Sequence, residues 1–204
     1  MANEGKRENT KIANRKAILK AGEQLFCELG YEATSIRNII KMSGLSTGTF
    51  YNYFRTKEEV FEELVDILVE KARASIHASR KVYDSDMKTM VTAFREFFRL
   101  FEEEPQLLKF ISKNQDRYSY YRTRGKFDGI VADLEADLGS IFDKMNIPKP
   151  ESLKTISYVI FGTFLEMVNE MANTENYPVE KRTGELATLI QGAIFRMLSP
   201  NILG

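Results

Sequence analysis

The sequence has little of what most enzyme and metal sites need. Its 204 residues include one cysteine, Cys27, and one histidine, His77. A single cysteine excludes an internal disulfide framework and a CxxC metal or redox motif. His77 stands in a charged stretch, and the acidic residues show no metal-site spacing that we recognise. We therefore expect neither an enzyme nor a metal or other cofactor.

Long apolar runs are also missing. No window approaches the roughly 20 uninterrupted apolar residues that span a bilayer. The first 20 residues are polar and charged, without the apolar segment that drives secretion. We expect a cytoplasmic protein without a membrane partner.

The charge balance is zero overall but uneven along the chain. Residues 1–56 hold nine Lys and Arg against five Asp and Glu, and the remaining 148 residues hold 20 against 24. These counts give net charges of +4 and −4. A basic N-terminal part on an acidic remainder suits a protein that presents one end to a polyanion.

Helical periodicity begins after a polar segment, residues 1–10, which we expect to form a loose arm. Apolar residues from Ile18 to Leu29 then follow one helical stripe that Gly30 ends. A second, short helix follows Thr34 or Ser35, either of which can cap it, and breaks at Gly44. A third begins at Ser46 and runs toward Phe54.

A capping box, Thr56 with Glu59, predicts the start of a fourth helix that reaches about Ser79. Five further helices are predicted, and alternating strand patterns are absent. They begin at Ser85 or Asp86 and at Pro105, and cover about 118–145, 151–173 and 179–198. The chain is thus predicted to be all-α, with about nine helices.

Two short helices around a glycine turn, at residues 34–54, have helix-turn-helix spacing. In such motifs the second helix enters the major groove with a small polar outer face. Leu45 and Phe50 can point inward, which leaves for the outside Ser46, Thr47, Gly48, Thr49, Tyr51 and Asn52. Their hydroxyl, amide and phenol groups can meet base edges and phosphates. Taken singly, however, these residues also suit helix caps and packing.

Lys57 falls in the first turn of the fourth helix, where the helix dipole disfavours a cation. A phosphate contact would explain the choice, because a helix N-terminus also attracts anions. The alternative is a solvated lysine balanced by Glu58 and Glu59.

The segment GYEATSIRNIIKMSGLSTGTFYNYFRTKEEVFEELV resembles the DNA-binding domain of the TetR family of bacterial regulators. The resemblance covers residues 12–65, and it departs from the family pattern at Ile40 and Ser43. Its matching positions, in register and without gaps, are Gly30, Thr34, Ile36, Ile39, Gly44, Ser46, Gly48, Tyr51, Phe54, Lys57 and Glu58.

The resemblance implies a three-helix DNA-binding domain with its arm at residues 1–56 and a helical-bundle domain for ligand sensing and dimerisation at 57–204. It places Thr34, Ser35 and Arg37 near the DNA backbone and the residues from Ser46 to Asn52 in the groove. Phosphates would be clamped by Tyr51, Tyr53 and Lys57. The basic residues of the arm either add positive charge toward the DNA or belong to a tail that is merely disordered.

Aromatic residues are dense in the second half. Aromatics at helical spacing are more often core than pocket, but a cavity among them would bind an apolar or aromatic ligand. The candidate ligand-binding residues are Phe94, Phe97, Phe98, Phe101, Phe110, Tyr118, Tyr121, Phe127, Tyr158 and Phe161. The polar, aromatic and basic run 114–124 forms either a pocket mouth or a solvated helix start, and we prefer the latter.

Helix-turn-helix repressors usually read two half-sites, so we expect a homodimer on a palindromic double-stranded DNA operator. The last two predicted helices combine small and apolar residues, and the candidate interface is Gly162, Leu165, Leu189, Gly192, Ala193 and Phe195. A small-molecule effector would release the repressor from DNA. The alternative is a helical DNA-binding protein without a ligand.

Overall fold

This computed structural model describes residues 2–80 and 87–198. They contain ten α-helices and one 3₁₀-helix, joined by turns and loops. Those two ranges contain no strand, and the all-α prediction is confirmed. The helices are α1 (Ala2–Ala33), α2 (Ile36–Ser43), α3 (Thr47–Tyr51), α4 (Lys57–Arg80), α5 (Met87–Glu103), α6 (Pro105–Lys113), η1 (Gln115–Arg117), α7 (Tyr118–Thr123), α8 (Asp128–Lys144), α9 (Leu153–Asn173) and α10 (Val179–Leu198). The predicted caps Ser85 and Asp86 lie outside the described residues.

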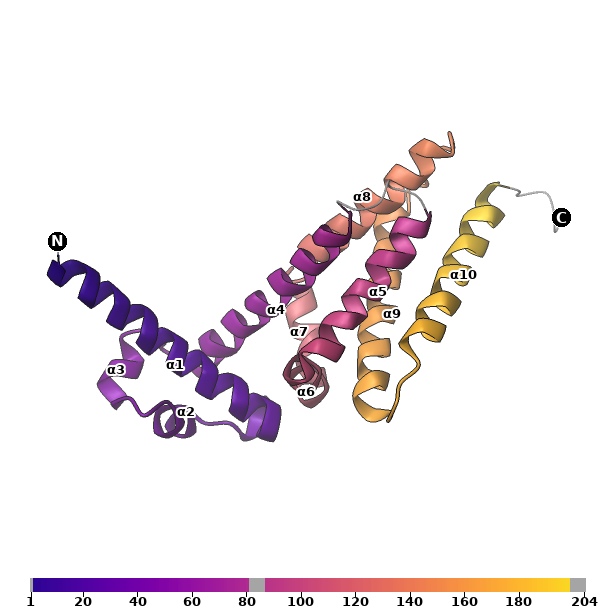
Figure 1. The fold of residues 1–204 in the computed structure, drawn as a ribbon. Helices are drawn as coiled ribbons and strands as arrows, with labels where there is room; N and C mark the ends of the chain where they lie inside the picture. The colour runs from indigo at the N-terminus through magenta and orange to yellow at the C-terminus, as the bar shows by residue number, and fades with distance from the viewer. Residues whose placement is uncertain (1, 81–86, 199–204) are drawn as a thin grey trace.

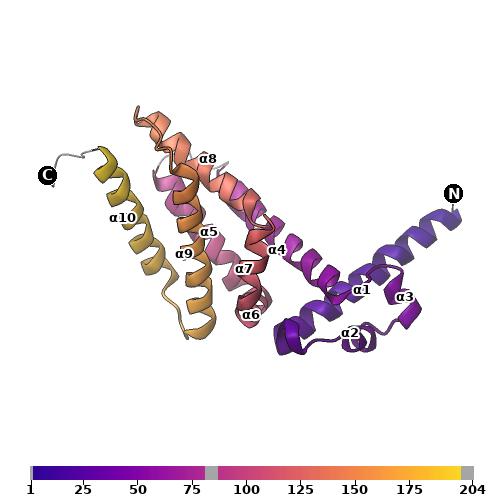
Figure 2. The same cartoon turned by 180° about the vertical axis from the view of Figure 1, so that it is seen from behind.

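The molecule is elongated, with a small unit at one end (Figure 1). We call α1–α3 the head and the bundle of α5–α10 the body; α4 runs from the head into the body. The two chain ends lie at opposite ends of the molecule, and α10 stands at the edge farthest from the head (Figures 1 and 2). The described residues include no helix with the length and apolarity that crossing a bilayer requires.

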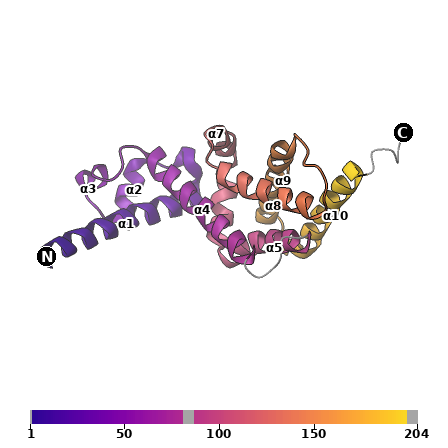
Figure 3. The ribbon, with the colours of Figure 1, turned by 90° about the horizontal axis from the view of Figure 1, so that it is seen from above.

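Packing joins the two units along α4 and α1. Helix α5 packs against α4 and α10, and α9 packs against α6 and α8. Helix α1 contacts α2 and α4 and also reaches α6 in the body. Seen from above, the head lies to one side of the bundle, with α7 on the side nearer to it (Figure 3).

The loose arm expected at residues 1–10 is wrong for the described part, because α1 begins at Ala2. Lys, Arg, Glu and Ala are good helix formers, and adding a residue to an existing helix is far easier than starting one. The apolar stripe from Ile18 onward supplies the existing helix. The extension is exposed from Gly5 to Lys11, and Thr10 donates to the carbonyl of Lys6 at 2.9 Å.

Gly30 interrupts α1 as predicted, but one further turn follows, up to Ala33. Gly30 adopts φ 80° and ψ 169°, which breaks the helical hydrogen-bond pattern there. Asn114, buried at the C-terminus of α6, supplies the missing partners. Its Oδ1 accepts from the Tyr31 N–H at 2.7 Å, and its Nδ2 donates to the carbonyls of Phe26 at 3.2 Å and Phe110 at 2.6 Å.

The single helix expected over 118–145 is also wrong, since α7 and α8 are separate. Gly125 adopts φ 71°, and the N–H of Lys126 bonds back to the carbonyl of Tyr121 at 3.1 Å. A left-handed glycine just after the last helical residue is a common helix stop. This break places η1 and α7 beside the head, and Asn114 and Tyr121 are buried. The run 114–124 is therefore mixed. Asn114 and Tyr121 are packed, whereas the solvated surface that we preferred is present at Gln115, Asp116, Arg122, Thr123 and Arg124.

Candidate nucleic-acid interface

Phe50 fixes the position of α3 in the head. Its side chain is fully buried, with its ring 5.4 Å from Tyr51 and 6.2 Å from Phe54. Ile39 of α2 is buried in the same core, and Leu45 packs against it from the turn. The two inward positions predicted from the sequence, Leu45 and Phe50, are thus confirmed.

Both short helices have the caps expected of them. Ser35 Oγ accepts the N–H of Asn38 at 3.2 Å, and Ser46 Oγ accepts that of Thr49 at 3.1 Å. Gly44 adopts φ 70° at the C-cap of α2, which glycine reaches without steric cost. The predicted turn between two capped helices is therefore present.

The outer side of α3 is small and polar. Ser46, Thr47, Gly48 and Asn52 are exposed, and Tyr51 keeps 52% of its surface accessible. Thr49 is half-buried. Nothing lies within 4 Å of a Cβ built on Gly48, so the backbone there borders open space. Hydroxyl and amide groups on such a surface can reach base edges and phosphates.

The flanking candidates divide into accessible and inaccessible side chains. Ser35 and Arg37 are exposed, whereas Tyr53 is half-buried and its hydroxyl accepts from Asn14 Nδ2 at 3.4 Å. Thr34, which the resemblance places near the DNA backbone, has no accessible side chain for a contact with DNA. Only 2% of it is exposed, and its hydroxyl donates to the Gly30 carbonyl at 2.7 Å, where it stabilises the turn after the kink.

Lys57 has partners within the head itself. Its Nζ donates to the carbonyls of Tyr31 at 2.8 Å, Thr34 at 2.9 Å and Glu32 at 3.4 Å, and lies 4.2 Å from the centre of the Tyr31 ring. These carbonyls end α1, where a cation is favourable. The structure therefore explains this lysine without a phosphate, and a phosphate contact would have to exchange these bonds.

Basic residues near the N-terminus of α1 also differ in availability. Lys6, Arg7 and Lys11 are exposed on the helical extension. Arg15, in contrast, forms an ion pair with Glu63 of α4, its Nε donating at 2.9 Å, and its guanidinium lies 4.7 Å from the Phe54 ring centre. Arg15 thus ties α1 to α4.

Most of the candidate ligand-binding aromatics are packed together in the body. Phe94, Phe97, Phe98, Phe101, Phe110, Tyr121, Phe127 and Phe161 are buried, and Tyr158 is half-buried with its hydroxyl donating to Asp128 at 2.7 Å. The side chain of Tyr118 lies outside the described residues. Phe164 joins the cluster at 4.7 Å from Phe94 and 5.4 Å from Phe97. None of these residues lines the two hollows described next.

Two hollows open at the surface of the molecule. One of about 640 Å³ lies between head and body, among α1, α6 and α9, and residues of polar type, such as Lys20, Glu28 and Lys109, form most of its lining. Cys27 also borders it, and burial, with Glu23 nearby, raises the pKa of this thiol to about 12. The other, about 340 Å³, is an apolar groove among α8, α9 and α10.

The apolar groove coincides with part of the predicted dimer face. Leu189 lines it with 71% of its surface exposed, beside Val159 at 65% and Ala193. Gly162 and Gly192 are exposed and Leu165 is half-buried, while the side chain of Phe195 lies outside the described residues. The described part of the predicted interface thus lies largely at the surface.

Known proteins resemble this chain most clearly in and around the head. Residues 18–64 match the model of the bacterial regulatory proteins of the tetR family. The transcriptional regulator YhgD of Bacillus subtilis is 34% identical over 30% of this chain and 32% of its own length, and QacR of Staphylococcus aureus is 42% identical over 24% and 27%. These matches thus span about a third or less of the relatives' length.

Solved structures match over nearly the whole chain. FadR of Bacillus halodurans, a fatty acid degradation regulator, superposes with a TM-score of 0.73 at 21% identity, covering 88% of this chain and 95% of that one. FadR of B. subtilis gives a TM-score of 0.66 at 22% identity, with 85% and 96% covered. At such identities the likeness establishes the fold alone.

We predict that Lys57→Met lowers the stability of the protein without changing the salt dependence of its DNA binding. The substitution leaves the half-buried α1 carbonyls without their donor, which costs about 1–3 kcal/mol in the free energy of unfolding. Urea denaturation measures this loss, and Lys181→Met, at an exposed lysine of α10, is the control. A different outcome would instead assign Lys57 to a phosphate contact. The variant would then unfold like the wild type, and the slope of log binding constant against log salt concentration would be smaller by about one.

Proposed function

We propose that this chain, whose residues 18–64 match the model of the bacterial regulatory proteins of the tetR family, is a homodimeric transcriptional repressor that a small molecule releases from DNA. The observation that carries the proposal is the exposed polar surface from Ser46 to Asn52, held outward by the buried Phe50. The DNA-binding unit is residues 1–56, and residues 57–204 sense the ligand and dimerise.

DNA is read by α3 in the major groove. Thr47, Thr49, Tyr51 and Asn52 offer hydrogen-bonding groups to base edges and phosphates, and Gly48 lets the backbone approach closely. Ser35 and Arg37, at the start of α2, contact the DNA backbone. Two relatives, KstR2 of Mycobacterium tuberculosis and ComR of Escherichia coli, are named as repressors, which supports this direction of control.

Dimerisation covers the exposed apolar face of α9 and α10. A second copy seated there removes Leu189 and Val159 from water, and the exposed Gly162 and Gly192 allow its helices to approach closely. The pairing gives a four-helix interface around a twofold axis. It must hold the two heads about 34–36 Å apart, or a multiple of this, to meet successive half-sites.

The effector is a ligand with a long apolar chain, such as an acyl thioester. FadR of B. subtilis was solved in complex with stearoyl-CoA, and the fatty acid metabolism regulator of the same species is 23% identical over 87% of this chain. The ligand enters among the aromatic residues of the body. Because these side chains pack against one another, a ligand there must displace some of them, which links binding to a change in shape.

A second candidate function is DNA binding by a helical protein with no small-molecule effector. The dense packing of Phe94, Phe97 and Phe98 with Phe164 favours it. One relative, SlmA of Vibrio cholerae, is named a nucleoid occlusion factor and is 22% identical over 81% of this chain.

We predict that the double variant Thr47→Ala, Asn52→Ala binds DNA from the region upstream of the protein's own gene on the order of tenfold more weakly than the wild type. Both side chains are exposed, so the melting temperature should hold. Fluorescence anisotropy across a salt series measures the affinity. The matched control is Asn173→Ala with Thr174→Ala at the end of α9. If the wild-type protein shows no salt-sensitive binding to any upstream fragment, the regulator proposal fails.

We predict that Leu189→Asp shifts the protein from dimer to monomer in analytical ultracentrifugation, because a carboxylate cannot be buried unpaired in an apolar interface. DNA affinity should fall with it. Ile12→Asp places the same charge on an exposed apolar residue of α1 and should leave the dimer intact. A Leu189→Asp variant that sediments like the wild-type dimer would place the interface elsewhere.

We predict that stearoyl-CoA raises the melting temperature and reduces DNA affinity, whereas free coenzyme A does neither. Ligand binding to the folded state alone stabilises it by mass action. Acyl-CoAs of graded chain length, followed by thermal unfolding and by anisotropy with labelled DNA, measure both effects. Normal DNA binding without response to any chain length would favour the second candidate function.

A further inference from the structure

Four polar side chains join the head to the body at the start of α4. We call Tyr31, Glu58, Arg117 and Tyr121 the junction cluster. Tyr31 belongs to the last turn of α1 in the head, and Glu58 to the first turn of α4. Arg117 and Tyr121 come from η1 and α7 in the body.

Glu58 is the centre of this cluster. Its Oε1 accepts from the hydroxyl of Tyr121 at 2.6 Å, and its Oε2 accepts from Arg117 Nη2 at 2.5 Å and from the hydroxyl of Tyr31. Burial favours the neutral acid, but the hydrogen bonds from Tyr121 and Tyr31 and the charge of Arg117 outweigh it and lower the pKa of Glu58. The carboxylate thus stays ionised at neutral pH.

Arg117 reaches across the boundary in a second way. Its guanidinium carbon lies 4.0 Å from the ring centre of Tyr31 and 4.8 Å from that of Tyr120. The guanidinium is therefore stacked between a head residue and a body residue. Asn114, which precedes η1, bonds the backbone N–H of the same Tyr31 at 2.7 Å. Asn114 and Arg117 consequently hold Tyr31, at the end of α1, by both the backbone and the ring of this tyrosine.

These contacts are directional, unlike the apolar packing around them. Partly buried ion pairs add little net stability, because desolvation offsets the attraction. Their geometry nevertheless defines one orientation, since a planar guanidinium binds and stacks in few arrangements. The junction cluster is thus better suited to setting an angle than to strengthening the fold.

The cluster also touches the aromatic core. Tyr121 stacks on Phe61 with ring centres 5.5 Å apart, and Phe61 stacks on Phe110 at 4.9 Å. Tyr121 and Phe110 are both candidate ligand-binding residues. A displacement of Tyr121 that breaks its 2.6 Å hydrogen bond would withdraw a hydroxyl from Glu58.

We propose that the junction cluster sets the angle of the head relative to the body, with Arg117 and Tyr121 as positioning residues for DNA binding. The inference rests on the proposed function for its effect on DNA, but not for the angle itself. An effector that displaces Tyr121 would loosen Glu58 and release the head from the orientation that fits two half-sites. The coupling is reciprocal, so DNA would oppose the same displacement.

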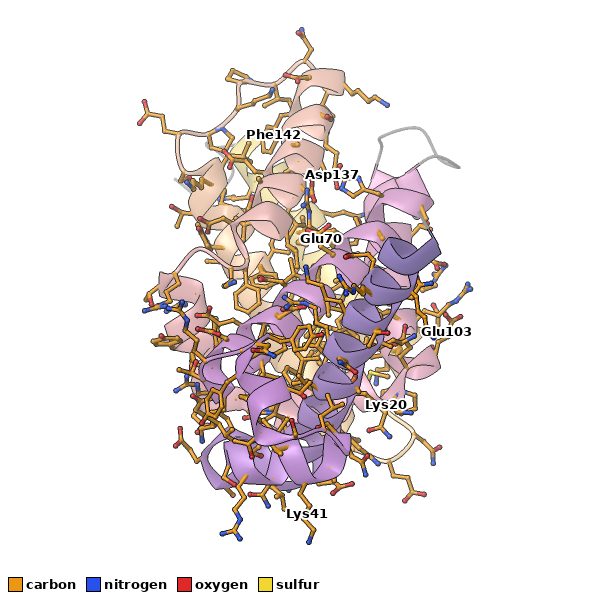
Figure 4. The ribbon with its side chains drawn as sticks, turned by 90° about the vertical axis from the view of Figure 1, so that its left-hand side faces the viewer. Lys20, Lys41, Glu70, Glu103, Asp137 and Phe142 are labelled. Carbon is orange, nitrogen blue, oxygen red and sulfur yellow. The ribbon has the colours of Figure 1, made fainter. Side chains whose placement is uncertain are left out.

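Single-molecule FRET between the head and the body tests the angle without DNA. Dyes are placed on Lys41→Cys in α2 and Glu151→Cys before α9, both at exposed positions, and labelled protomers are diluted with unlabelled ones. Lys41 projects from the lower edge of the head (Figure 4). Cys27 is buried and protonated, so the introduced cysteines take the label.

The variants are Arg117→Gln and Tyr121→Phe, with Arg122→Gln as the control for charge loss on an exposed residue of α7. We expect both test variants to shift or broaden the transfer efficiency and to weaken DNA binding by about tenfold, within the usual range of coupling between sites. Arg117→Lys, which keeps a cation at Glu58 but loses the planar guanidinium, should recover only part of the wild-type efficiency. The control should match the wild type.

A Tyr121→Phe variant that is folded and has the wild-type transfer efficiency would overturn the inference. If Arg117→Gln does not fold, the Tyr121→Phe variant alone is the test. Circular dichroism and thermal unfolding establish folding for each variant. Wild-type protein that fails to bind DNA would refute the proposed function while leaving the FRET result on the angle intact.

Discussion

The burial of one ring, that of Phe50, is the constraint on which the proposed DNA-binding surface depends. A helix of five residues cannot persist by its own hydrogen bonds, because nucleation costs more than so short a helix recovers. Helix α3 exists because Ser46 caps it and Phe50 anchors it in the core of the head. The polar groups of α3 that are proposed to meet DNA are therefore placed by an apolar contact on the opposite side of the same helix.

Head and body are less separate than a boundary at residue 56 suggests. The kink at Gly30 leaves backbone groups of α1 without helical partners, and Asn114 of the body satisfies them. Glu58 is likewise bonded from both sides. The head thus completes its hydrogen bonding with side chains from the body, so a change in the body reaches the head through specific atoms.

The sequence was sufficient to predict most of the helices, the caps of α2 and α3 and the inward side of α3, because each has a local signal. Ser35, Gly44, Ser46 and Phe50 lie where their spacing placed them. Gly125 is a local signal for the break after α7. The apolar periodicity on both sides of this glycine obscured that signal. The partners of Lys57 could not be predicted, because they belong to the end of α1, more than 20 residues away. The same is true of Glu58 and Arg117, whose contact depends on tertiary packing.

The length of α4 determines how far a small motion travels. At 1.5 Å per residue its 24 residues extend about 36 Å from the head into the body. If the helix pivots by five degrees about its far end, the first turn moves by about 3 Å. That displacement is close to the rise of one base pair, about 3.4 Å. Tilting of a single rod can therefore put a recognition helix out of step with its half-site, with no rearrangement inside the head.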